Sequence, residues 1–383
     1  MAKKVLIVIV LIMTMVQMNL QAEGTIAEKY YLYVGAYTQN DDEGIYIYQF
    51  DATDGDLKYI STVKGVKNPS YLAINFRKNL LIAVNEISEF QGEKSGSITS
   101  YRINAADGSL VELSQVASGG GSPCFISVNN SATQAFVANY GGGNISIFPL
   151  LPDGRLQPFS DLKQHVGSGP VINRQQNPHA HSVVLSPKED FALAVDLGID
   201  KVITYSINGK KGDLNKVSEF NMTPGAGPRH ITFHKDKRFA FIINELNSTI
   251  TSCLFDAKIG SLSLIQTVNT LPSDFTEKNY CADIHVSPNG KFLYGSNRGH
   301  DSIVIFEIDQ KSGALAYVGH NSAKGNFPRN FMIDPTGKFL LVANQNSNNI
   351  VVFKIDQETG KLRANGVEVE VSKPVCLKMM PIK

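Results

Sequence analysis

The chain has 383 residues, of which 43% are hydrophobic, and its formal net charge is +1. Such a balanced charge gives no electrostatic basis for binding nucleic acid or an anionic membrane surface. The length would suit two or three domains, but one internal repeat extends over nearly the whole chain. The chain has no tryptophan, which argues against the β-propeller families whose repeats carry a tryptophan signature.

The first 22 residues resemble a secretory signal peptide. Lys3 and Lys4 precede an apolar stretch over residues 5–15, and Ala22 supplies a small residue at the expected cleavage point. Polar side chains after this stretch leave it short for a membrane span. The sequence therefore predicts an exported protein with no stable membrane span after processing, periplasmic if the source is Gram-negative. A retained membrane anchor is the alternative.

One spacing recurs six times along the rest of the chain. A small residue, usually proline, is followed sixteen positions later by Asn or Asp (85 − 69 = 16 for the first pair), and successive repeats begin 47 to 57 residues apart. A strand-rich period of roughly 50 residues indicates a propeller or a solenoid. The pairs are Pro69/Asn85, Pro123/Asn139, Ala180/Asp196, Pro228/Asn244, Cys281/Asn297 and Pro328/Asn344.

Each repeat has the pattern of apolar runs and turns that is typical of one propeller blade. In the last repeat, apolar runs at residues 331–333, 339–343 and 350–355 alternate with turns rich in Gly, Asn and Asp, and a weaker run follows. Short apolar runs bounded by such residues predict strands joined by hairpins. Four strands per repeat are typical of a β-propeller blade.

The two ends of the chain complete the ring. Residues 31–36 match the second strand of a repeat, but the matching first strand would fall near residue 20, inside the leader. Residues 374–379 match a first strand that has no repeat after it. We therefore expect an all-β fold in which residues 30–383 form a single seven-bladed β-propeller domain, with the C-terminal strand closing the first blade and removing free sheet edges. A solenoid with capped ends is the alternative, but it would not need this strand.

Positions that repeat in every blade should serve the fold, and positions that vary at one rim are candidates for chemistry. The Asn or Asp of each repeat could form a ring of cation ligands, but its side chain is also well suited to bonding turn backbone. Because this position is repeated throughout, we favour the structural interpretation. The four cysteines have no zinc-site spacing, and no metal or cofactor is predicted.

Two variable positions should face the same rim, because the start of the first strand and the end of the second are neighbours in an antiparallel pair. The residue after the small start residue is Ser70, Cys124, His181, Arg229, Ala282 or Arg329. The residue after the Asn or Asp is Tyr37, Glu86, Tyr140, Leu197, Glu245, Arg298 or Gln345.

The non-repeated polar residues gather in the later blades. They are His179, His181, Arg229, Glu245, Arg298 and Arg329. Any one of them alone could be a solvated charge or a core histidine. Three arginines at one mouth repel one another, however, so an anion must compensate them. Glu245 can neutralise one arginine, and we expect Arg298 and Arg329 to hold a carboxylate or phosphate group of a ligand.

The assembled motifs resemble those of the seven-bladed propeller lactonases, which include bacterial 6-phosphogluconolactonases and the related fungal carboxymuconate-lactonising enzyme. The resemblance covers residues 30–380. The segments that carry it are 33–38, 139–144, 177–181 (Asn-Pro-His-Ala-His), 227–230 (Gly-Pro-Arg-His) and 244–246.

The resemblance implies an enzyme that hydrolyses a small, anionic sugar-acid lactone without a metal. His181 would be the general base, Arg229 would stabilise the oxyanion, and Glu245 would orient Arg229 or transfer a proton to the leaving alkoxide. The remaining candidates would bind substrate: His179, Arg298, Arg329, Tyr37, Glu86, Tyr140 and Gln345.

Two other functions stay open at this point. One is the reverse, lactone-forming reaction. The other is an exported propeller without catalysis that binds a glycan or a protein partner, because propellers also serve as binding platforms and tyrosines such as Tyr37, Tyr71 and Tyr140 could contribute to such a surface. The combination of His181, Arg229 and Glu245 favours the enzyme.

Overall fold

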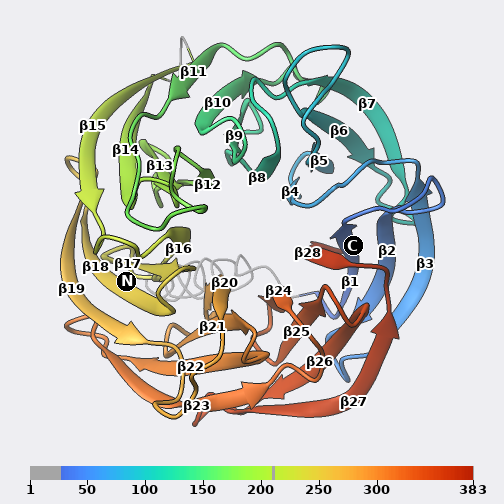
Figure 1. Cartoon of the computed structure of the whole chain (residues 1–383). Helices are drawn as coiled ribbons and strands as arrows, with labels where there is room; N and C mark the ends of the chain where they lie inside the picture. The colour runs from blue at the N-terminus through green and yellow to red at the C-terminus, as the bar shows by residue number, and fades with distance from the viewer. Residues whose placement is uncertain (1–26, 209–211, 383) are drawn as a thin grey trace, which may run out of the picture.

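The computed structural model describes residues 27–208 and 212–382. Over these residues the chain forms seven four-stranded antiparallel sheets, which stand as blades around a central axis (Figure 1). The predicted signal peptide, residues 1–22, lies outside the described residues. In the part that is described, no helix has the length and apolar character that a membrane crossing requires.

The blades follow one another around the ring in chain order. Their strands, from the axis outward, are β28 (Pro374–Pro381), β1 (Lys29–Ala36), β2 (Gly44–Asp51) and β3 (Leu57–Lys64); β4 (Leu72–Asn75), β5 (Leu80–Asn85), β6 (Ser97–Ile103) and β7 (Leu110–Ala117); β8 (Pro123–Val128), β9 (Gln134–Asn139), β10 (Asn144–Pro149) and β11 (Asp161–Gln164); β12 (Ala180–Leu185), β13 (Phe191–Asp196), β14 (Lys201–Asn208) and β15 (Asp213–Asn221); β16 (Pro228–Phe233), β17 (Phe239–Asn244), β18 (Thr249–Asp256) and β19 (Ser261–Asn269); β20 (Tyr280–Val286), β21 (Phe292–Arg298), β22 (Ser302–Ile308) and β23 (Leu315–Ser322); β24 (Pro328–Ile333), β25 (Phe339–Asn344), β26 (Asn349–Ile355) and β27 (Leu362–Glu370).

The C-terminal strand closes the first blade, as the sequence predicts. Strand β28 pairs with β1 in antiparallel register, with Leu32 opposite Met379 and Val34 opposite Leu377. The N- and C-terminal strands therefore share one sheet, and β1 is paired along both of its edges.

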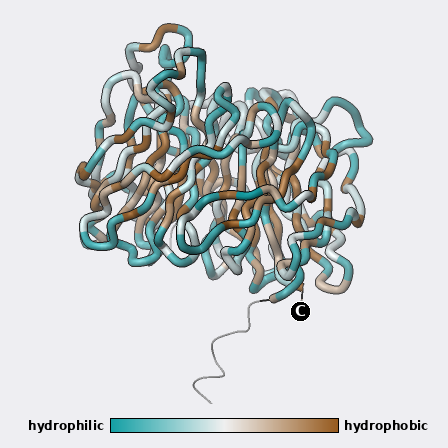
Figure 2. Tube along the Cα trace, turned by 90° about the horizontal axis from the view of Figure 1, so that it is seen from below, coloured by the Kyte–Doolittle hydropathy of each residue, from teal (hydrophilic) through white to brown (hydrophobic). Residues whose placement is uncertain are grey.

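The apolar pattern of the strands explains the stacking of the blades. Second strands such as β5, β9, β17 and β25 are buried along their whole length, because side chains on both of their faces pack against neighbouring blades. The outermost strands are less buried, and β27 alternates between half-buried and exposed residues. Seen from the side, the apolar stretches lie within the blades and the polar loops lie at both ends of the ring (Figure 2).

The repeated Asn residues fasten consecutive blades together. Asn139, Asn297 and Asn344 each donate from Nδ2 to a backbone carbonyl just after the last strand of the preceding blade, at 2.9 to 3.1 Å. All three are fully buried. These contacts support the structural interpretation of the repeated position.

Candidate active site

A β-bulge in the innermost strand aims one side chain of a blade at the axis. In β12 the pairing jumps from Ala180 to Ser182, which leaves His181 as the extra, unpaired residue. The same irregularity occurs at Cys124, Arg229 and Arg329 in β8, β16 and β24. Bulges turn side chains away from the regular pleat and are frequent beside functional sites. In these four blades the bulged residue is therefore the first of the two variable positions, the one that follows the small start residue of the repeat.

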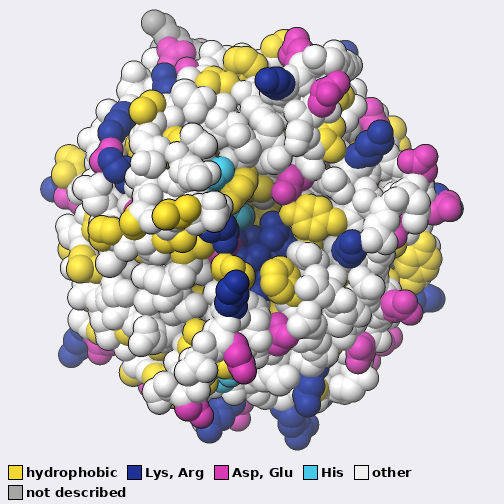
Figure 3. Space-filling view, in the orientation of Figure 1, with side chains coloured by type: hydrophobic (Ala, Val, Ile, Leu, Met, Phe, Trp, Pro, Cys, Tyr) yellow, Lys and Arg dark blue, Asp and Glu magenta, His cyan; other side chains and the backbone are white. Residues whose placement is uncertain are grey.

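A cavity of about 370 Å³ is lined by residues from both variable positions of the repeats. Dark blue arginine and lysine side chains gather in the hollow at the centre of the ring (Figure 3). The cavity is lined by Glu86, Cys124, Tyr140, Arg174, His181, Glu245, Tyr280, Arg298, Phe327 and Arg329. The structure therefore brings together six of the predicted site residues in the lining of one cavity: Glu86, Tyr140, His181, Glu245, Arg298 and Arg329.

Three arginines surround the Glu245 carboxylate. Oε2 lies 2.7 Å from Arg298 Nη2 and 3.1 Å from Arg229 Nε, and Oε1 pairs with Arg174. Burial alone would raise the pKa of Glu245, but the three guanidinium groups lower it to about 2. Glu245 is therefore a carboxylate at neutral pH. Of its two predicted roles, this favours orienting the arginines over transferring a proton.

Arg298 is engaged by Glu245 and by backbone. Besides the carboxylate it contacts the carbonyl oxygens of Tyr280 and Cys281, at 3.2 and 3.0 Å, and its guanidinium lies 5.0 Å from the ring centroid of Phe327. These contacts fix its direction. Arg298 thus contributes charge to the cavity wall, but its ion pair with Glu245 leaves it less available to a ligand than the sequence suggested.

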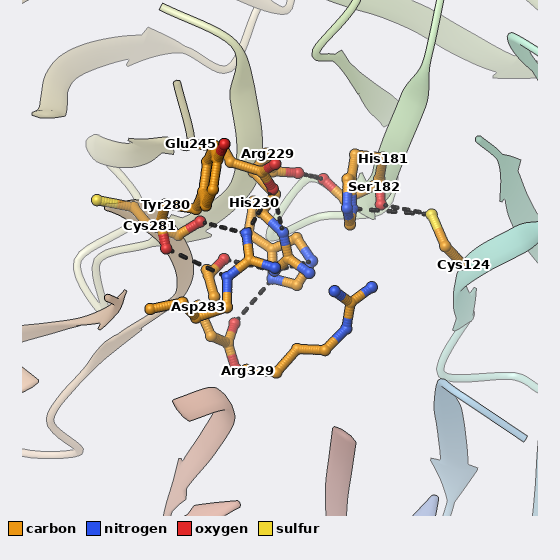
Figure 4. A network of polar contacts seen from close by, with 12 residues as sticks. Cys124, His181, Ser182, Arg229, His230, Glu245, Tyr280, Cys281, Asp283 and Arg329 are labelled. Atoms are coloured by element: carbon orange, nitrogen blue, oxygen red, sulfur yellow. Dashed lines mark hydrogen bonds and ion pairs between the residues drawn. The ribbon is translucent and has the colours of Figure 1, made fainter. Parts of the chain in front are cut away.

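Arg329, by contrast, faces the cavity without a carboxylate within ion-pair distance among the described residues. Its Nη2 donates to the Tyr37 hydroxyl at 2.9 Å, and that hydroxyl donates to Glu86 Oε2 at 2.9 Å. Burial would lower the pKa of Arg329, but Tyr37, Glu86 and Glu245 raise it above the usual value. Figure 4 shows its guanidinium directed toward His181 and Cys124. Tyr37 itself lies behind this wall.

His181 is a neutral imidazole in the cavity wall. It is 4% exposed, and burial, followed by the charges of Arg229 and nearby groups, lowers its pKa well below 6.5. Its Nδ1 lies 3.7 Å from Cys124 Sγ, while Nε2 makes no hydrogen bond within the described part of the chain. Burial raises the pKa of Cys124 far above the usual thiol value. Cys124 is therefore a thiol and not a thiolate nucleophile.

Arg229 lies beneath the cavity and is 2% exposed. Its Nη1 donates to the carbonyl of Ala282 at 2.6 Å. Burial, together with Arg298 and Arg329, lowers its pKa to about 10, so the group stays charged at neutral pH. Nε is enclosed without an aligned hydrogen bond despite its 3.1 Å contact with Glu245. Nη2 has no partner among the described residues and is the only nitrogen left for a ligand.

Besides Tyr37, two more predicted substrate-binding residues lie outside the cavity lining. His179 stacks on Tyr140, with ring centroids 4.3 Å apart, and its Nδ1 contacts the Tyr140 carbonyl oxygen at 2.9 Å. It supports a wall residue from behind. Gln345 donates to Asn346 at 3.2 Å and is not part of the cavity lining.

Four residues of the cavity lining were not predicted as site residues: Cys124, Arg174, Tyr280 and Phe327. Cys124 occupies the same variable position as His181, Arg229 and Arg329. Tyr280 and Phe327 each directly precede the small start residue of a repeat. Treating this preceding residue as a third variable position would have identified both of them. Phe327 has a φ of 66°, a left-handed conformation that is strained for an aromatic residue. Arg174 lies on the loop 165–179 between β11 and β12 and has no counterpart in the repeat.

The sequence and the fold of this chain are similar to those of known lactonases. The family described as "Lactonase, 7-bladed beta-propeller" matches residues 31–379. A 6-phosphogluconolactonase of Bacillus subtilis is 38% identical over 352 residues, which cover 92% of this chain and 99% of that protein. One of Formosa agariphila is 35% identical over 306 residues, 78% of this chain and 85% of that protein. The solved structure of a periplasmic gluconolactonase of Pseudomonas aeruginosa has a TM-score of 0.87 at 35% identity, with 93% of this chain and 100% of that chain covered.

Proposed function

Because the chain belongs to the seven-bladed β-propeller lactonases and is a lactone-hydrolysing carboxylic ester hydrolase, we propose that its substrate is an anionic sugar-acid lactone of the 6-phosphogluconolactone type. The observation that carries this proposal is the charge of the cavity. Its wall and floor hold four guanidinium groups and two carboxylates, and Arg329 has no carboxylate partner among the described residues. A phosphate or carboxylate group matches a guanidinium fork in shape and charge.

In the proposed reaction His181 first acts as a general base. Water attacks the lactone carbonyl carbon while Nε2 of the neutral imidazole takes a proton from that water. Burial, and next the charges of the neighbouring arginines, keep the imidazole unprotonated and able to accept this proton. An anionic substrate beside Arg329 would offset part of the repulsion, which raises the pKa of His181 and makes it a stronger base when the substrate is bound.

Arg229 and His181 complete the reaction. The oxyanion of the tetrahedral intermediate would accept a hydrogen bond from Nη2 of Arg229, whose charge and position are set before the substrate arrives. When the ring C–O bond breaks, the leaving alkoxide takes the proton that His181 holds. This returns the imidazole to its neutral form and yields the open acid. Glu245 stays ionised throughout and holds the arginines.

We further propose that the chain is exported, as its N-terminal residues predict. The similarity to a periplasmic gluconolactonase supports this location. Export also bears on the substrate, because a sugar-acid lactone without phosphate would then be the more accessible compound. Arg329 would in that case bind a carboxylate group or a polarised hydroxyl group instead of a phosphate group.

The test is hydrolysis of 6-phosphogluconolactone and glucono-δ-lactone by the purified protein, compared with His181→Ala. Loss of the general base is expected to reduce kcat by roughly 10²–10⁴-fold. His320→Ala is the control, because His320 also has a lowered pKa but is only half-buried and lies on the outer strand β23. Full activity in His181→Ala would refute the mechanism. Turnover of glucono-δ-lactone alone, or of neither lactone, would refute the proposed anionic substrate.

A further inference from the structure

A cluster of buried aromatic side chains packs against the proposed catalytic base, His181. The rings of Tyr71 and Phe125 stack with their centroids 4.2 Å apart, and His230 meets Phe125 edge-on at 5.3 Å. His230 also lies edge-on to His181, at 5.4 Å. All four residues are buried. His230 is therefore the polar member of this aromatic cluster beside the proposed catalytic base.

The buried carboxylate of Asp283 fixes one nitrogen of His230. Asp283 is 2% exposed, and its Oδ1 lies 2.8 Å from His230 Nδ1. Burial would raise the pKa of Asp283, but His285, His230 and their hydrogen bonds hold it well below the usual value. An ionised carboxylate can only accept hydrogen bonds. The proton between the two groups must therefore reside on Nδ1 of His230.

The other nitrogen of His230 then faces Arg229 as an acceptor. Burial, and next the charge of Arg229, lowers the pKa of His230 to about 4 despite the opposing effect of Asp283. The ring is neutral at physiological pH, and with Nδ1 protonated its Nε2 carries a lone pair. That lone pair lies 3.3 Å from Arg229 Nη1, as the network in Figure 4 shows.

We propose that Asp283 and His230 form a positioning pair that orients the Arg229 guanidinium toward the reacting carbonyl group. The inference rests on the proposed lactonase function. Asp283 selects the tautomer of His230, and Nε2 of that tautomer, together with the Ala282 carbonyl oxygen, holds Nη1 of Arg229. Nη2 is then left to face the substrate. His230 and Asp283 thus act through Arg229 and do not themselves contact the substrate.

The charged and titratable groups around His230 fit this arrangement. Arg229 adjoins it on β16, Asp283 and His285 on β20, His181 on β12, and the Tyr71 ring meets it from the loop before β4. A protonated His230 would place a second positive charge and an N–H group against the Arg229 guanidinium. Protonation of His230 would therefore remove the hydrogen bond by which Nε2 holds Arg229.

His285 supplies a matched control for the pair. It binds the other oxygen of Asp283, with Nε2 2.9 Å from Oδ2, but it has no contact with Arg229 among the described residues. Its side chain is 31% exposed. Replacing either histidine removes one hydrogen bond from Asp283, but only His230→Phe also removes the acceptor of Arg229. Phenylalanine keeps the aromatic packing in both places.

The first test compares lactone hydrolysis by His230→Phe and His285→Phe. A misdirected arginine should reduce kcat by roughly 10–100-fold in His230→Phe with little change in KM, because positioning errors of this kind slow the chemical step. His285→Phe should retain kcat within about threefold. Equal losses in the two variants, or a loss confined to KM, would overturn the inference, because either result would indicate a general role in stability or binding.

The second test reads the tautomer directly and does not depend on turnover. In the wild-type protein labelled with ¹⁵N-histidine, the His230 ring should show a protonated Nδ1 and an unprotonated Nε2 from pH 6 to 8. Its signals are identified by their loss in His230→Phe, or in His230→Asn if the first variant does not fold. A protonated Nε2 would overturn the inference. A wild-type protein that hydrolyses no lactone would instead refute the proposed function, whatever tautomer is found.

Discussion

Arg329 donates a hydrogen bond to the hydroxyl of Tyr37 at 2.9 Å, although 292 positions separate the two residues in the sequence. The contact exists because β28 closes the first blade and so places the end of β1 beside β24 of the last blade. Tyr37 in turn donates to Glu86. The two ends of the propeller thus meet at the cavity, and ring closure is what holds the proposed anion-binding arginine in place.

Replacing Arg329 should weaken binding of an anionic lactone more than binding of a neutral one. We expect Arg329→Met to raise KM for 6-phosphogluconolactone by roughly 10–100-fold, since a charge-assisted contact contributes about 1.5–3 kcal/mol. The KM for glucono-δ-lactone should change by no more than about threefold. Steady-state kinetics on both substrates measure the difference.

Arg363→Met controls for loss of a positive charge, because Arg363 is exposed on the outer strand β27. It should leave both KM values unchanged. If Arg329→Met affected the two lactones equally, Arg329 would not be the residue that recognises the anion.

Glu245 should be important for stability as well as for activity. Glu245→Gln leaves Arg298, Arg229 and Arg174 without their shared counter-charge. Removing one partner from a buried ion pair costs about 3–5 kcal/mol, so we expect a loss of this size in the free energy of unfolding, measured by denaturant titration. Activity should fall too, because Arg229 loses one of the groups that orient it.

The control for Glu245 is Glu219→Gln on the outer strand β15. Glu219 also pairs with two cations, Lys201 and Lys216, but at the protein surface. Such pairs contribute about 1 kcal/mol or less. Similar losses in the two variants would argue against the buried cluster as a special source of stability.

The fold could be predicted from the sequence because it is repeated. The sixteen-residue spacing is the distance from the bulged start of an inner strand to the end of the next strand, as the pairing of Pro328 with Asn344 shows. The same regularity indicated the closing strand. Repetition also distinguished structural positions, such as the repeated Asn residues that bind backbone, from candidate site positions, such as His181 and Arg329.

The contacts inside the site could not be predicted in the same way. Spacing places Arg229, Arg298 and Arg329 at one end of the ring, but side-chain geometry decides which of them Glu245 holds and which lies below the cavity. Arg174 comes from the loop 165–179, which no other blade repeats. Its neighbour Gln175 anchors this loop by donating from Nε2 to the Leu197 carbonyl at 2.8 Å, a contact that no sequence pattern indicates.

Stability should decrease as the pH falls below about 6.5. His181 and His230 have pKa values below 6.5 in the folded protein, about 4 for His230, because burial and Arg229 disfavour their charged forms. The unfolded chain then binds more protons between pH 6.5 and 4, so each histidine stabilises the fold above pH 6.5 and loses this contribution as the pH falls. Each contributes a slope of up to about 1.4 kcal/mol per pH unit.

Denaturant titrations between pH 4.5 and 7.5 at constant ionic strength measure this dependence. His230→Phe should show a shallower decline than the wild type, because one of the two histidines no longer titrates. An unchanged slope in this variant would mean that His230 is not held neutral by its surroundings. Below pH 4 a further loss is expected as Asp283 and Glu245 become protonated, because their pKa values are lowered in the folded protein.

The closing strand should be essential for the whole ring. Ending the chain after Lys373 removes β28 and exposes one edge of β1, which pairs with β28 along its length from Tyr30 to Ala36. The cavity would suffer as well, because Tyr37 follows β1 directly and supports Arg329. We expect this truncated chain to aggregate, since an unpaired inner strand offers a hydrogen-bonding edge to other chains. Ending the chain after Pro381 instead keeps β28. It removes the hydrogen bond of Ile382 to Lys29 and the packing of its side chain at the edge of the core, so this control should remain monodisperse and cooperatively folded. Size-exclusion chromatography and thermal unfolding distinguish the two chains. A soluble, cooperatively unfolding protein that ends at Lys373 would mean that the remaining strands form a stable ring without closure.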